Sequence, residues 1–258
     1  MGISIQGKIA LITGASAGIG RSTAFALARE GARLLLCARS TEALAGFEEE
    51  LRAAGAADIH NFALDVRNRL EVQSAIAELP REWQDIHILV NNAGLARGLE
   101  KLYLDDPDHW DEMIDTNVKG LLYVTRAVLP GMVERAAGHV VNMGSTAAYM
   151  AYAGGSVYCA TKASEKMLSE GMRIDLLGAN VRVTSIDPGM VETRFSEIRF
   201  VGDKNRAAKV YANVTPLTPD DVADAIVWAV TRPAHVNVSS VVLTPINQAN
   251  AVTILRNS

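Results

Sequence analysis

The sequence predicts an α/β fold in which a parallel β-sheet carries helices on both faces. Three observations support this prediction. Short apolar runs alternate with longer amphipathic stretches, the apolar runs show little alternation with polar residues, and a glycine-rich turn joins the first run to the first helical stretch. Because the 258 residues are 49% hydrophobic and no linker or low-complexity tract divides them, residues 1–258 are predicted to form a single domain.

Seven apolar runs are the predicted strands, since a parallel strand is buried on both faces and needs apolar side chains throughout. They are Lys8–Thr13, Arg33–Ala38, Asp58–Leu64, Ile86–Asn92, Gly138–Gly144, Val181–Asp187 and Ser239–Pro245. The predicted helical stretches are Gly18–Glu30, Thr41–Ala54, Asn68–Leu79, Trp110–Ala136, Val157–Leu177 and Asp220–Thr231. The expected fold class is therefore a doubly wound sheet of seven parallel strands flanked by helices.

The segment Gly189–Thr215 interrupts this pattern, because a connection between a strand and a helix usually has about 2 to 6 residues. Long insertions at the carboxyl end of a parallel sheet often serve as lids or binding loops. We therefore expect a substrate lid at about residues 189–215, with a loosely packed surface excursion as the alternative.

Composition argues against several classes of partner. The formal net charge is −4, and neither sign of charge gathers into a long run, which disfavours binding to nucleic acid or to an anionic membrane. No apolar stretch reaches the roughly 18 residues of a membrane span, and the first apolar run is too short for a signal peptide. We expect a soluble, cytoplasmic protein.

Cysteine and histidine residues indicate neither disulfides nor a metal site. Cys37 and Cys159 form no Cys-x-x-Cys pair, and the five histidines lack the spacing of metal ligands, so no metal is assigned. Cys159, beside Tyr158, is interpreted as a small buried thiol, with a nucleophile as the alternative. His139 opens an apolar strand and is interpreted as a polar residue at a sheet edge.

The first strand runs directly into a glycine turn, with Gly14, Gly18 and Gly20 in the sequence TGASAGIG. Such a turn lets the backbone approach a pyrophosphate closely and directs free N–H groups of a helix N-terminus toward the anion. The pattern is GxxxGxG without a following GK[ST], which disfavours a P-loop nucleotidase. The turn predicts a dinucleotide site, although glycine at such turns also has purely conformational uses.

The end of the second predicted strand indicates which dinucleotide binds. NAD-binding proteins usually carry an acidic residue there for the ribose 2′-hydroxyl, whereas a 2′-phosphate needs a cation. This strand ends in Ala38 followed by Arg39 and Ser40. We predict NADP, with Arg39 against the phosphate and Ser40 as a hydrogen-bond donor. A solvated surface arginine is the alternative.

A tyrosine and a lysine lie four residues apart on one predicted helix face, Tyr158 and Lys162. An ammonium beside a phenol favours the phenolate, so Tyr158 is predicted to exchange a proton with a carbonyl or alcohol oxygen. Ser145, at the end of the fifth strand, is predicted to hold the same oxygen, and Asn117 to anchor a water that relays protons to Lys162. Taken singly, each residue also has an ordinary structural explanation. A Ser145–Lys162 hydrolase dyad is disfavoured because no GxSxG elbow is present.

Together these motifs resemble the short-chain dehydrogenase/reductase family over nearly the whole chain. The matching segments are Thr13–Gly20, Asn91–Gly94, Asn117, Ser145, Tyr158–Lys162 and Asp187–Thr193. The resemblance implies a Rossmann fold and hydride transfer between the nicotinamide and a substrate carbon beside Tyr158. It also implies that Lys162 holds the nicotinamide ribose, that Asp65 and Val66 lie by the adenine, and that residues 188–195 close over the cofactor.

The implied cofactor residues are Gly14, Ser16, Ala17, Gly18, Ile19, Gly20, Arg39, Ser40, Asp65, Val66, Asn92, Ala93, Gly94, Tyr158, Lys162, Pro188, Gly189, Val191, Thr193 and Phe195. Segments such as LDVRNR, IRFVGD and LTPDDVADAIVW further resemble the NADP-dependent 3-hydroxy acid dehydrogenase branch. This likeness implies a homotetramer acting on L-serine, L-allo-threonine or 3-hydroxypropionate, or reducing malonic semialdehyde. Ser40 stands where that branch often has a second arginine, so Arg39 is left as the main cation for the phosphate.

A 3-hydroxy acid carries a carboxylate, which arginine captures well. We expect Arg199 in the lid to be the anion ligand, with Arg194 as the second candidate. The alternative is that both are surface arginines in salt bridges on the lid. A sulfonate also fits, so reduction of sulfoacetaldehyde is a competing activity. A non-enzymatic dinucleotide sensor is the second class of function, disfavoured because a sensor does not need the set Asn117, Ser145, Tyr158 and Lys162.

Overall fold

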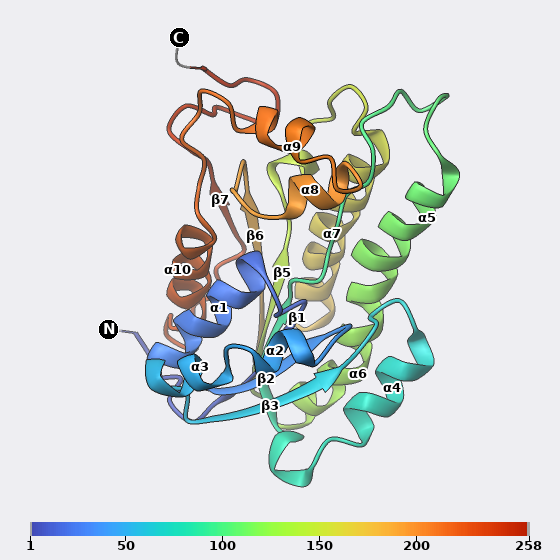
Figure 1. The fold of residues 1–258 in the computed structure, drawn as a ribbon. Coiled ribbons are helices and arrows are strands. Elements are labelled where there is room, and N and C mark those ends of the chain that lie inside the picture. The colour runs from blue at the N-terminus through green and yellow to red at the C-terminus, as the bar shows by residue number, and fades with distance from the viewer. Residues whose placement is uncertain (1, 257–258) are drawn as a thin grey trace.

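Seven parallel strands form one sheet in the order β3-β2-β1-β4-β5-β6-β7 in the computed structural model, which describes residues 2–256 (Figure 1). The strands are β1 (Ile9–Thr13), β2 (Arg33–Ala38), β3 (Asp58–Ala63), β4 (Ile86–Asn91), β5 (Gly138–Met143), β6 (Val181–Pro188) and β7 (Ser240–Leu243). The strand order reverses between β1 and β4, and ligands of such sheets bind in the crevice at the carboxyl ends of the strands at that point.

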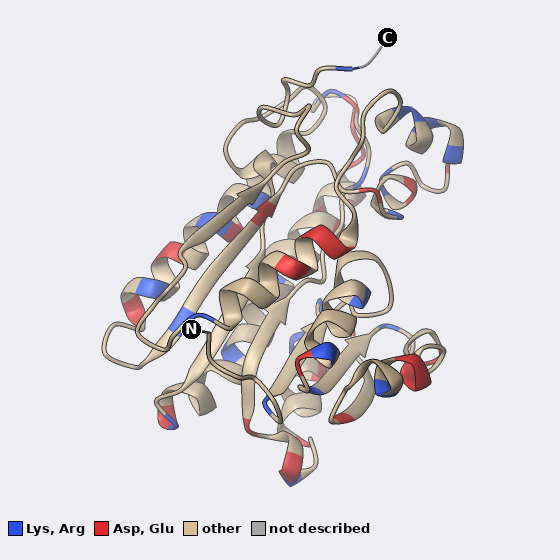
Figure 2. Ribbon diagram, turned by 90° about the vertical axis from the view of Figure 1, so that its left-hand side faces the viewer, with Lys and Arg blue, Asp and Glu red and all other residues tan. Residues whose placement is uncertain are grey.

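Helices cover both faces of the sheet, so nearly every strand side chain is buried. One face packs against α1 (Gly18–Arg29), α2 (Glu42–Ala45), α3 (Glu48–Ala54) and α10 (Pro219–Val230). The other packs against α4 (Arg69–Ala77), α6 (Leu121–Glu134) and α7 (Ser156–Asp175). Successive residues of β2 alternate between these two cores, which explains its uninterrupted apolar sequence. Figure 2 shows that the strands carry few charged residues, which lie mainly on the helices and loops.

All seven predicted strands are present, and their ends agree with the prediction to within two residues. The helix predicted over Thr41–Ala54 was wrong as a single element, because the chain turns at Gly46 between α2 and α3. This turn buries Phe47, whose ring lies 6.0 Å from that of Phe25. Packing of one aromatic side chain thus overrides the continuous helical pattern.

The helix predicted over Trp110–Ala136 is also divided. It begins earlier, as α5 (Pro107–Ile114), because Asp106 caps its N-terminus by accepting a hydrogen bond from the Asp108 N–H. A π-helical turn, η2 (Asp115–Gly120), then separates α5 from α6. Such turns inside helices are frequent at functional sites, and this one contains Asn117.

The interpretation of His139 as a polar residue at a sheet edge was wrong. β5 lies between β4 and β6, and His139 is buried with its Nε2 2.8 Å from the Thr184 hydroxyl. Burial lowers the pKa of His139 to about 3, so the imidazole is neutral at physiological pH. His139 belongs to the core of the sheet.

The predicted lid segment contains two short helices, α8 (Phe195–Arg199) and α9 (Lys204–Val210), above the carboxyl ends of the strands (Figure 1). Its base is fixed by an isolated parallel bridge between Val191 and Leu217. A buried glutamine near the C-terminus, Gln248, accepts a hydrogen bond of 2.8 Å from the Met190 N–H. Across residues 2–256, no helix combines the length and apolar character needed to cross a membrane.

Candidate active site

The glycine turn between β1 and α1 has the geometry of a close backbone approach. Gly14 and Gly18 have φ values of 63° and 54°, a region that favours glycine. A Cβ on Gly20 would lie 2.4 Å from the Gly14 carbonyl oxygen, so a side chain there would displace the turn. Asn92 braces it by donating hydrogen bonds from Nδ2 to the carbonyls of Thr13 (2.8 Å) and Gly14 (3.1 Å).

The N-terminus of α1 is free to receive an anion. Ala17, its N-cap residue, makes no side-chain cap, and the first turn of the helix has no acidic residue. Ser16, Gly18 and Ile19 are half-buried, and Ala17 is exposed. The lid lies nearby, since a Cβ on Gly18 would be 3.4 Å from the Thr193 methyl group. The turn therefore has the open N–H groups and the cover that a pyrophosphate site needs.

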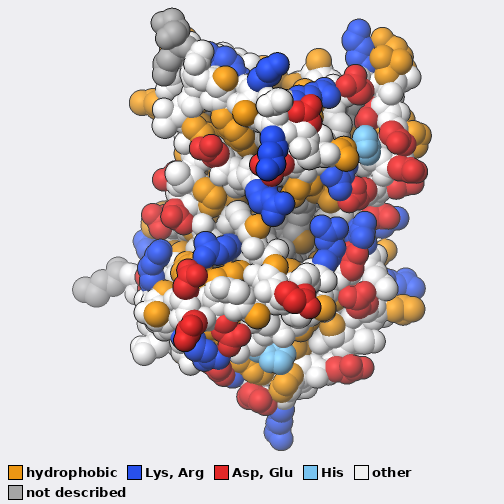
Figure 3. Space-filling model, in the orientation of Figure 1, with side chains coloured by type: hydrophobic (Ala, Val, Ile, Leu, Met, Phe, Trp, Pro, Cys, Tyr) orange, Lys and Arg blue, Asp and Glu red, His pale blue; other side chains and the backbone are white. Residues whose placement is uncertain are grey.

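Arg39 and Ser40 follow β2 on the exposed surface, near the same turn. The Ser40 hydroxyl donates a 2.5 Å hydrogen bond to Glu42, so its hydrogen is already used within the protein. The pKa of Asp65 is lowered, chiefly by its hydrogen bonds with Arg67 and to a smaller extent by the charge of Arg39. Arg39 therefore lies in the neighbourhood of Asp65. In the view of Figure 3, Lys and Arg side chains lie on both sides of a hollow in the middle of the molecular surface.

Val66 packs inward rather than outward. It is buried, and a Cβ on Gly120 would lie 2.7 Å from its Cγ2 atom, so it contacts the π-helical turn. The Asp65 carboxylate accepts hydrogen bonds of 2.6 to 3.0 Å from Arg67. Neither Asp65 nor the buried Val66 therefore presents a free side chain. Contact of these two residues with an adenine stays a prediction.

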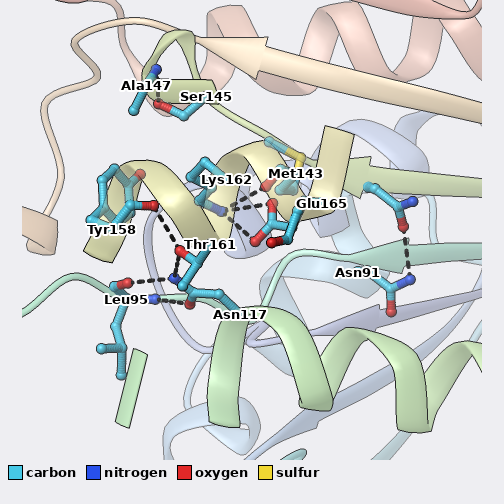
Figure 4. A network of polar contacts seen from close by, with 12 residues as sticks. Asn91, Leu95, Asn117, Met143, Ser145, Ala147, Tyr158, Thr161, Lys162 and Glu165 are labelled. Carbon is cyan, nitrogen blue, oxygen red and sulfur yellow. Dashed lines mark hydrogen bonds and ion pairs between the residues drawn. The ribbon is translucent and has the colours of Figure 1, made fainter. Parts of the chain in front are cut away.

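The loop after β4 is tied to the π-helical turn by Asn117, as Figure 4 shows. The Asn117 Oδ1 accepts from the Leu95 N–H, and Nδ2 donates to the Leu95 carbonyl, both at 2.9 Å. Nδ2 also donates to the Thr161 hydroxyl of α7 at 3.0 Å. Both Asn117 donor hydrogens are thus used within the protein. The side chain braces the site, and its predicted anchoring of a water that relays protons to Lys162 stays a prediction.

Ala93 and Gly94 continue this loop across the mouth of the site. The Ala93 N–H donates to the Thr13 hydroxyl at 2.9 Å, which joins the ends of β1 and β4. A Cβ on Gly94 would lie 3.3 Å from Asn117 Oδ1 and 3.6 Å from Lys162 Nζ. Gly94 therefore lies directly against the predicted catalytic residues.

Tyr158, Lys162 and Ser145 come together at the carboxyl end of β5. Tyr158 and Lys162 are buried on α7, whereas Ser145 caps the short 3-10 turn η3 (Thr146–Ala148) by accepting from the Ala147 N–H at 3.1 Å. Burial raises the pKa of the Tyr158 phenol, while its interaction with Ser145 acts in the lowering direction. The Phe195 ring of the lid covers the phenol, with ring centroids 5.6 Å apart.

The prediction that the pKa of Tyr158 is lowered was wrong for this structure. Lys162 Nζ lies 5.9 Å from the centroid of the Tyr158 ring and donates instead to the Met143 carbonyl (2.8 Å) and to both Glu165 carboxylate oxygens (2.9 Å). The pKa of Tyr158 therefore lies above its ordinary value rather than below it. The physical reason is that burial dominates while a carboxylate opposes the ammonium charge.

Arg199 is a second cationic side chain close to the Tyr158 ring. Its Nε donates to the Gly98 carbonyl and its Nη1 to the Tyr152 hydroxyl, both at 2.9 Å, and its Cζ lies 5.6 Å from the centroid of the Tyr158 ring. The remaining nitrogen, Nη2, is buried and has no hydrogen-bond partner among residues 2–256. A buried guanidinium nitrogen without an acceptor indicates a place for an anionic ligand.

Arg194 does not join this cluster. Its side chain is 77% exposed and lies 3.6 Å from Glu197 in an ion pair on the lid surface. The two lid arginines thus have different environments, and Arg199 is the one that points toward the predicted catalytic residues.

The start of the lid follows β6 and is held by the C-terminal segment. The Gly189 N–H donates to the Leu243 carbonyl at 2.7 Å, and a Cβ on Gly189 would lie 2.2 Å from Gln248 Oε1. Pro188 ends β6, and Val191 forms the bridge to Leu217. Further along this segment, Thr193 lies against Gly18 of the glycine turn. Contact of the segment with a cofactor stays a prediction.

Several residues of the site were missed by sequence reasoning. Tyr152 positions Arg199, Glu165 binds Lys162, and Arg97 joins Glu112 of α5 to the Ile198 carbonyl of the lid. Glu165 does have a sequence signal, because it is an acidic residue three positions after Lys162 on the same helix face. Tyr152 and Arg97 have no such signal, because their partners lie 47 and 101 positions away.

Cys159 is buried beside Tyr158, and burial raises the pKa of its thiol. A protonated thiol is a poor nucleophile. The geometry therefore favours the interpretation of Cys159 as a buried thiol.

The fold, the glycine turn and the cluster of Ser145, Tyr158 and Lys162 together define a dinucleotide-dependent oxidoreductase site. The chain matches the family model described as short chain dehydrogenase over residues 8–200, and it belongs to that family. Its relatives include the NADP-dependent 3-hydroxy acid dehydrogenase YdfG of Salmonella typhi, 48% identical over 94% of this chain and 97% of the relative. Serine 3-dehydrogenase of Rhizobium radiobacter is 42% identical over 93% of this chain and 95% of the relative.

A solved structure described as the closed form of serine dehydrogenase complexed with NADP+ is similar throughout. It superposes with a TM-score of 0.90 at 46% identity, covering 97% of this chain and 100% of that one. The structure of serine dehydrogenase from Escherichia coli gives a TM-score of 0.81 at 43% identity. These likenesses confirm the predicted fold class and family.

Proposed function

We propose that this protein is an NADP-dependent oxidoreductase that transfers a hydride between the nicotinamide and a small 3-hydroxy acid or its semialdehyde. The candidate substrates are L-serine, L-allo-threonine and the pair 3-hydroxypropionate and malonic semialdehyde. The observation that carries the proposal is the buried, unpartnered Nη2 of Arg199 beside Tyr158. A guanidinium nitrogen without an acceptor beside a phenol suits a substrate that carries both a carboxylate and a carbonyl group.

The chain's own residues fit NADP. The uncapped N-terminus of α1 and the glycine turn suit a pyrophosphate, and the exposed Arg39 suits the 2′-phosphate. The names of the relatives, two of which include NADP, support the same choice. When bound, this cofactor supplies or accepts the hydride. Ser40 donates to the phosphate only if its hydroxyl leaves Glu42.

The proton is handled by Tyr158. Its raised pKa keeps the phenol protonated at neutral pH, which suits donation to the oxygen of a carbonyl being reduced. Ser145 interacts with the phenol and is available to the same oxygen, while Arg199 orients the substrate through its carboxylate. Lys162 supplies positive charge near Tyr158. It stays the proposed ligand of the nicotinamide ribose, a contact that requires one of its N–H donors to leave Glu165 or the Met143 carbonyl. Asn117 holds α7, the π-helical turn and the β4 loop in register.

The lid role of residues 189–215 is part of the proposal. Arg199 and Phe195 both lie on α8, so the same short helix brings the anion ligand and the cover of Tyr158 to the site. Its backbone is tied to the β4 loop by a 3.0 Å hydrogen bond from the Gly98 N–H to the Arg199 carbonyl. Movement of α8 away from this loop opens the site to substrate.

Two alternatives are separated by experiment. A sulfonate also suits Arg199, so sulfoacetaldehyde is a competing substrate. A non-enzymatic NADP sensor binds the cofactor without turnover. The test follows the absorbance of NADPH. It is expected to fall when malonic semialdehyde or sulfoacetaldehyde is added to NADPH, and to rise when L-serine is added to NADP. NADPH binding without oxidation by any member of a panel of small aldehydes and 3-hydroxy acids contradicts the enzymatic proposal.

We also propose a cytoplasmic homotetramer. Apolar side chains are exposed along α6 and along α7 and the turn that follows it, namely Leu122, Val133, Met167, Ile174 and Leu177. Exposed apolar faces of this kind favour association between subunits. Sedimentation of the purified protein as a monomer at micromolar concentration contradicts the tetramer.

A further inference from the structure

Lys162 forms a buried ion pair with Glu165, one turn further along α7. The two residues are 6% and 3% exposed, and Figure 4 shows both side chains directed toward the end of β5. An ammonium has three N–H donors. They are directed at the Met143 carbonyl and at the two carboxylate oxygens of Glu165, so the protein itself satisfies the lysine completely.

Stability alone explains this pair poorly. Burying two charges costs about as much free energy as their attraction returns, and well-packed apolar residues of similar volume often serve a core better. The pair also lies against the predicted catalytic group, because Lys162 Nζ is 5.9 Å from the centroid of the Tyr158 ring. A role on the site is therefore the better explanation for a carboxylate at this position.

The charged and titratable groups around Glu165 are few. Lys162 and Tyr158 face it from α7, and Asp187 acts on it from β6. β5 contributes only neutral groups, including the Met143 carbonyl. The Asp187 carboxylate accepts hydrogen bonds from the Ser185 and Tyr149 hydroxyls and lacks an ion-pair partner among residues 2–256. Lys162 is thus the cation that Glu165 contacts directly.

We propose that Glu165 is a positioning residue that acts through Lys162 on the proton of Tyr158. Its carboxylate takes up the charge of the ammonium, so the phenol stays protonated and ready to donate to a carbonyl oxygen. Glu165 thereby sets the pH range over which Tyr158 is present as the phenol, which donates a proton to a carbonyl, and as the phenolate, which accepts one from an alcohol. This inference rests on the proposed acid–base role of Tyr158.

The electrostatic direction agrees with this role. Among the causes acting on the Tyr158 pKa, burial is the largest raising one, and the charge of Glu165 adds in the same direction. Burial also raises the pKa of Glu165 itself to about 7, against the lowering effect of Lys162. Removal of the carboxylate leaves the ammonium charge to act on the phenol unopposed, which favours the phenolate.

The experiment compares Glu165→Gln with the wild-type enzyme over a range of pH. The expected result is a shift of the acidic limb of kcat/KM for alcohol oxidation to lower pH by roughly one unit. Glu170→Gln is the matched control, because it removes the same charge from an exposed position on the same helix. Glu165→Asp, which keeps the charge, is expected to restore most of the wild-type profile.

A profile for Glu165→Gln that coincides with the wild-type profile overturns the inference, as does an equal shift in Glu170→Gln. If the amide variant does not fold, Glu165→Met provides the same comparison with an apolar side chain of similar volume. Tyr158→Phe separates this inference from the proposed function. Full turnover by Tyr158→Phe removes the acid–base role itself, whereas an inactive Tyr158→Phe with an unshifted Glu165→Gln removes only the role of Glu165.

Discussion

Replacement of Arg199 by Met is expected to weaken the use of anionic substrates selectively. Arg199 is held by Gly98 and Tyr152 and presents one buried nitrogen, Nη2, without a partner. A hydrogen bond to a charged group contributes about 1.5 to 3 kcal/mol. Loss of that bond therefore lowers kcat/KM for malonic semialdehyde by roughly 10- to 150-fold, mainly through KM.

The assay compares malonic semialdehyde with propanal, a neutral aldehyde of the same carbon number. Propanal has no carboxylate for Arg199, so its kcat/KM is expected to change by less than about threefold. Arg194→Met is the matched control, since it removes an exposed arginine from the same lid and leaves both substrates unaffected. Thermal unfolding checks the fold, because the variant also leaves the Tyr152 hydroxyl without its donor.

Equal losses on the two aldehydes refute the reasoning, because they indicate damage to the lid rather than loss of an anion ligand. An unchanged KM for malonic semialdehyde refutes it as well. A wild-type preference for sulfoacetaldehyde over malonic semialdehyde keeps Arg199 as the ligand but replaces the carboxylate by a sulfonate.

Two further predictions concern the cofactor and the buried ion pair. Arg39→Ala is expected to raise the Kd for NADP by roughly 10- to 100-fold and to leave the Kd for NAD nearly unchanged, as fluorescence titration measures; equal changes contradict the phosphate role. Burial raises the pKa of Glu165 from 4.5 to about 7, so the folded state holds this proton more tightly than the unfolded state. The free energy of unfolding of the wild type minus that of Glu165→Gln should therefore fall by on the order of 3 kcal/mol as the pH rises from about 4.5 to 7. Denaturant titrations at several pH values measure this difference, and a difference that stays constant over that range contradicts the prediction.

The sequence patterns were sufficient to predict the strands of the sheet and the relative placement of residues that are close together along the chain. The strands of a parallel sheet are apolar on both faces, so runs such as Arg33–Ala38 coincide with β2 at both ends. Tyr158 and Lys162 share a helix, and their common face follows from the period of the helix alone. The break at Gly46 and the π-helical turn depend on packing against other elements, which no local pattern contains.

Long-range contacts determine the remainder of the site. Arg199 was predicted to bind an anion, but its support by Gly98 and Tyr152 joins segments 101 and 47 positions apart. The pKa of Tyr158 was predicted to be lowered but is raised, because burial, the largest cause, arises only when α7 packs against the rest of the fold. Local sequence thus predicts which groups react, whereas the fold determines their protonation.

The most direct test of the account is the turnover of Tyr158→Phe with NADPH and malonic semialdehyde, measured together with the Kd for NADPH. Loss of the phenolic proton donor is expected to lower kcat by roughly 100- to 10,000-fold while cofactor affinity changes little. Substantial turnover by Tyr158→Phe, with NADPH bound as in the wild type, contradicts the central claim that this phenol donates the proton.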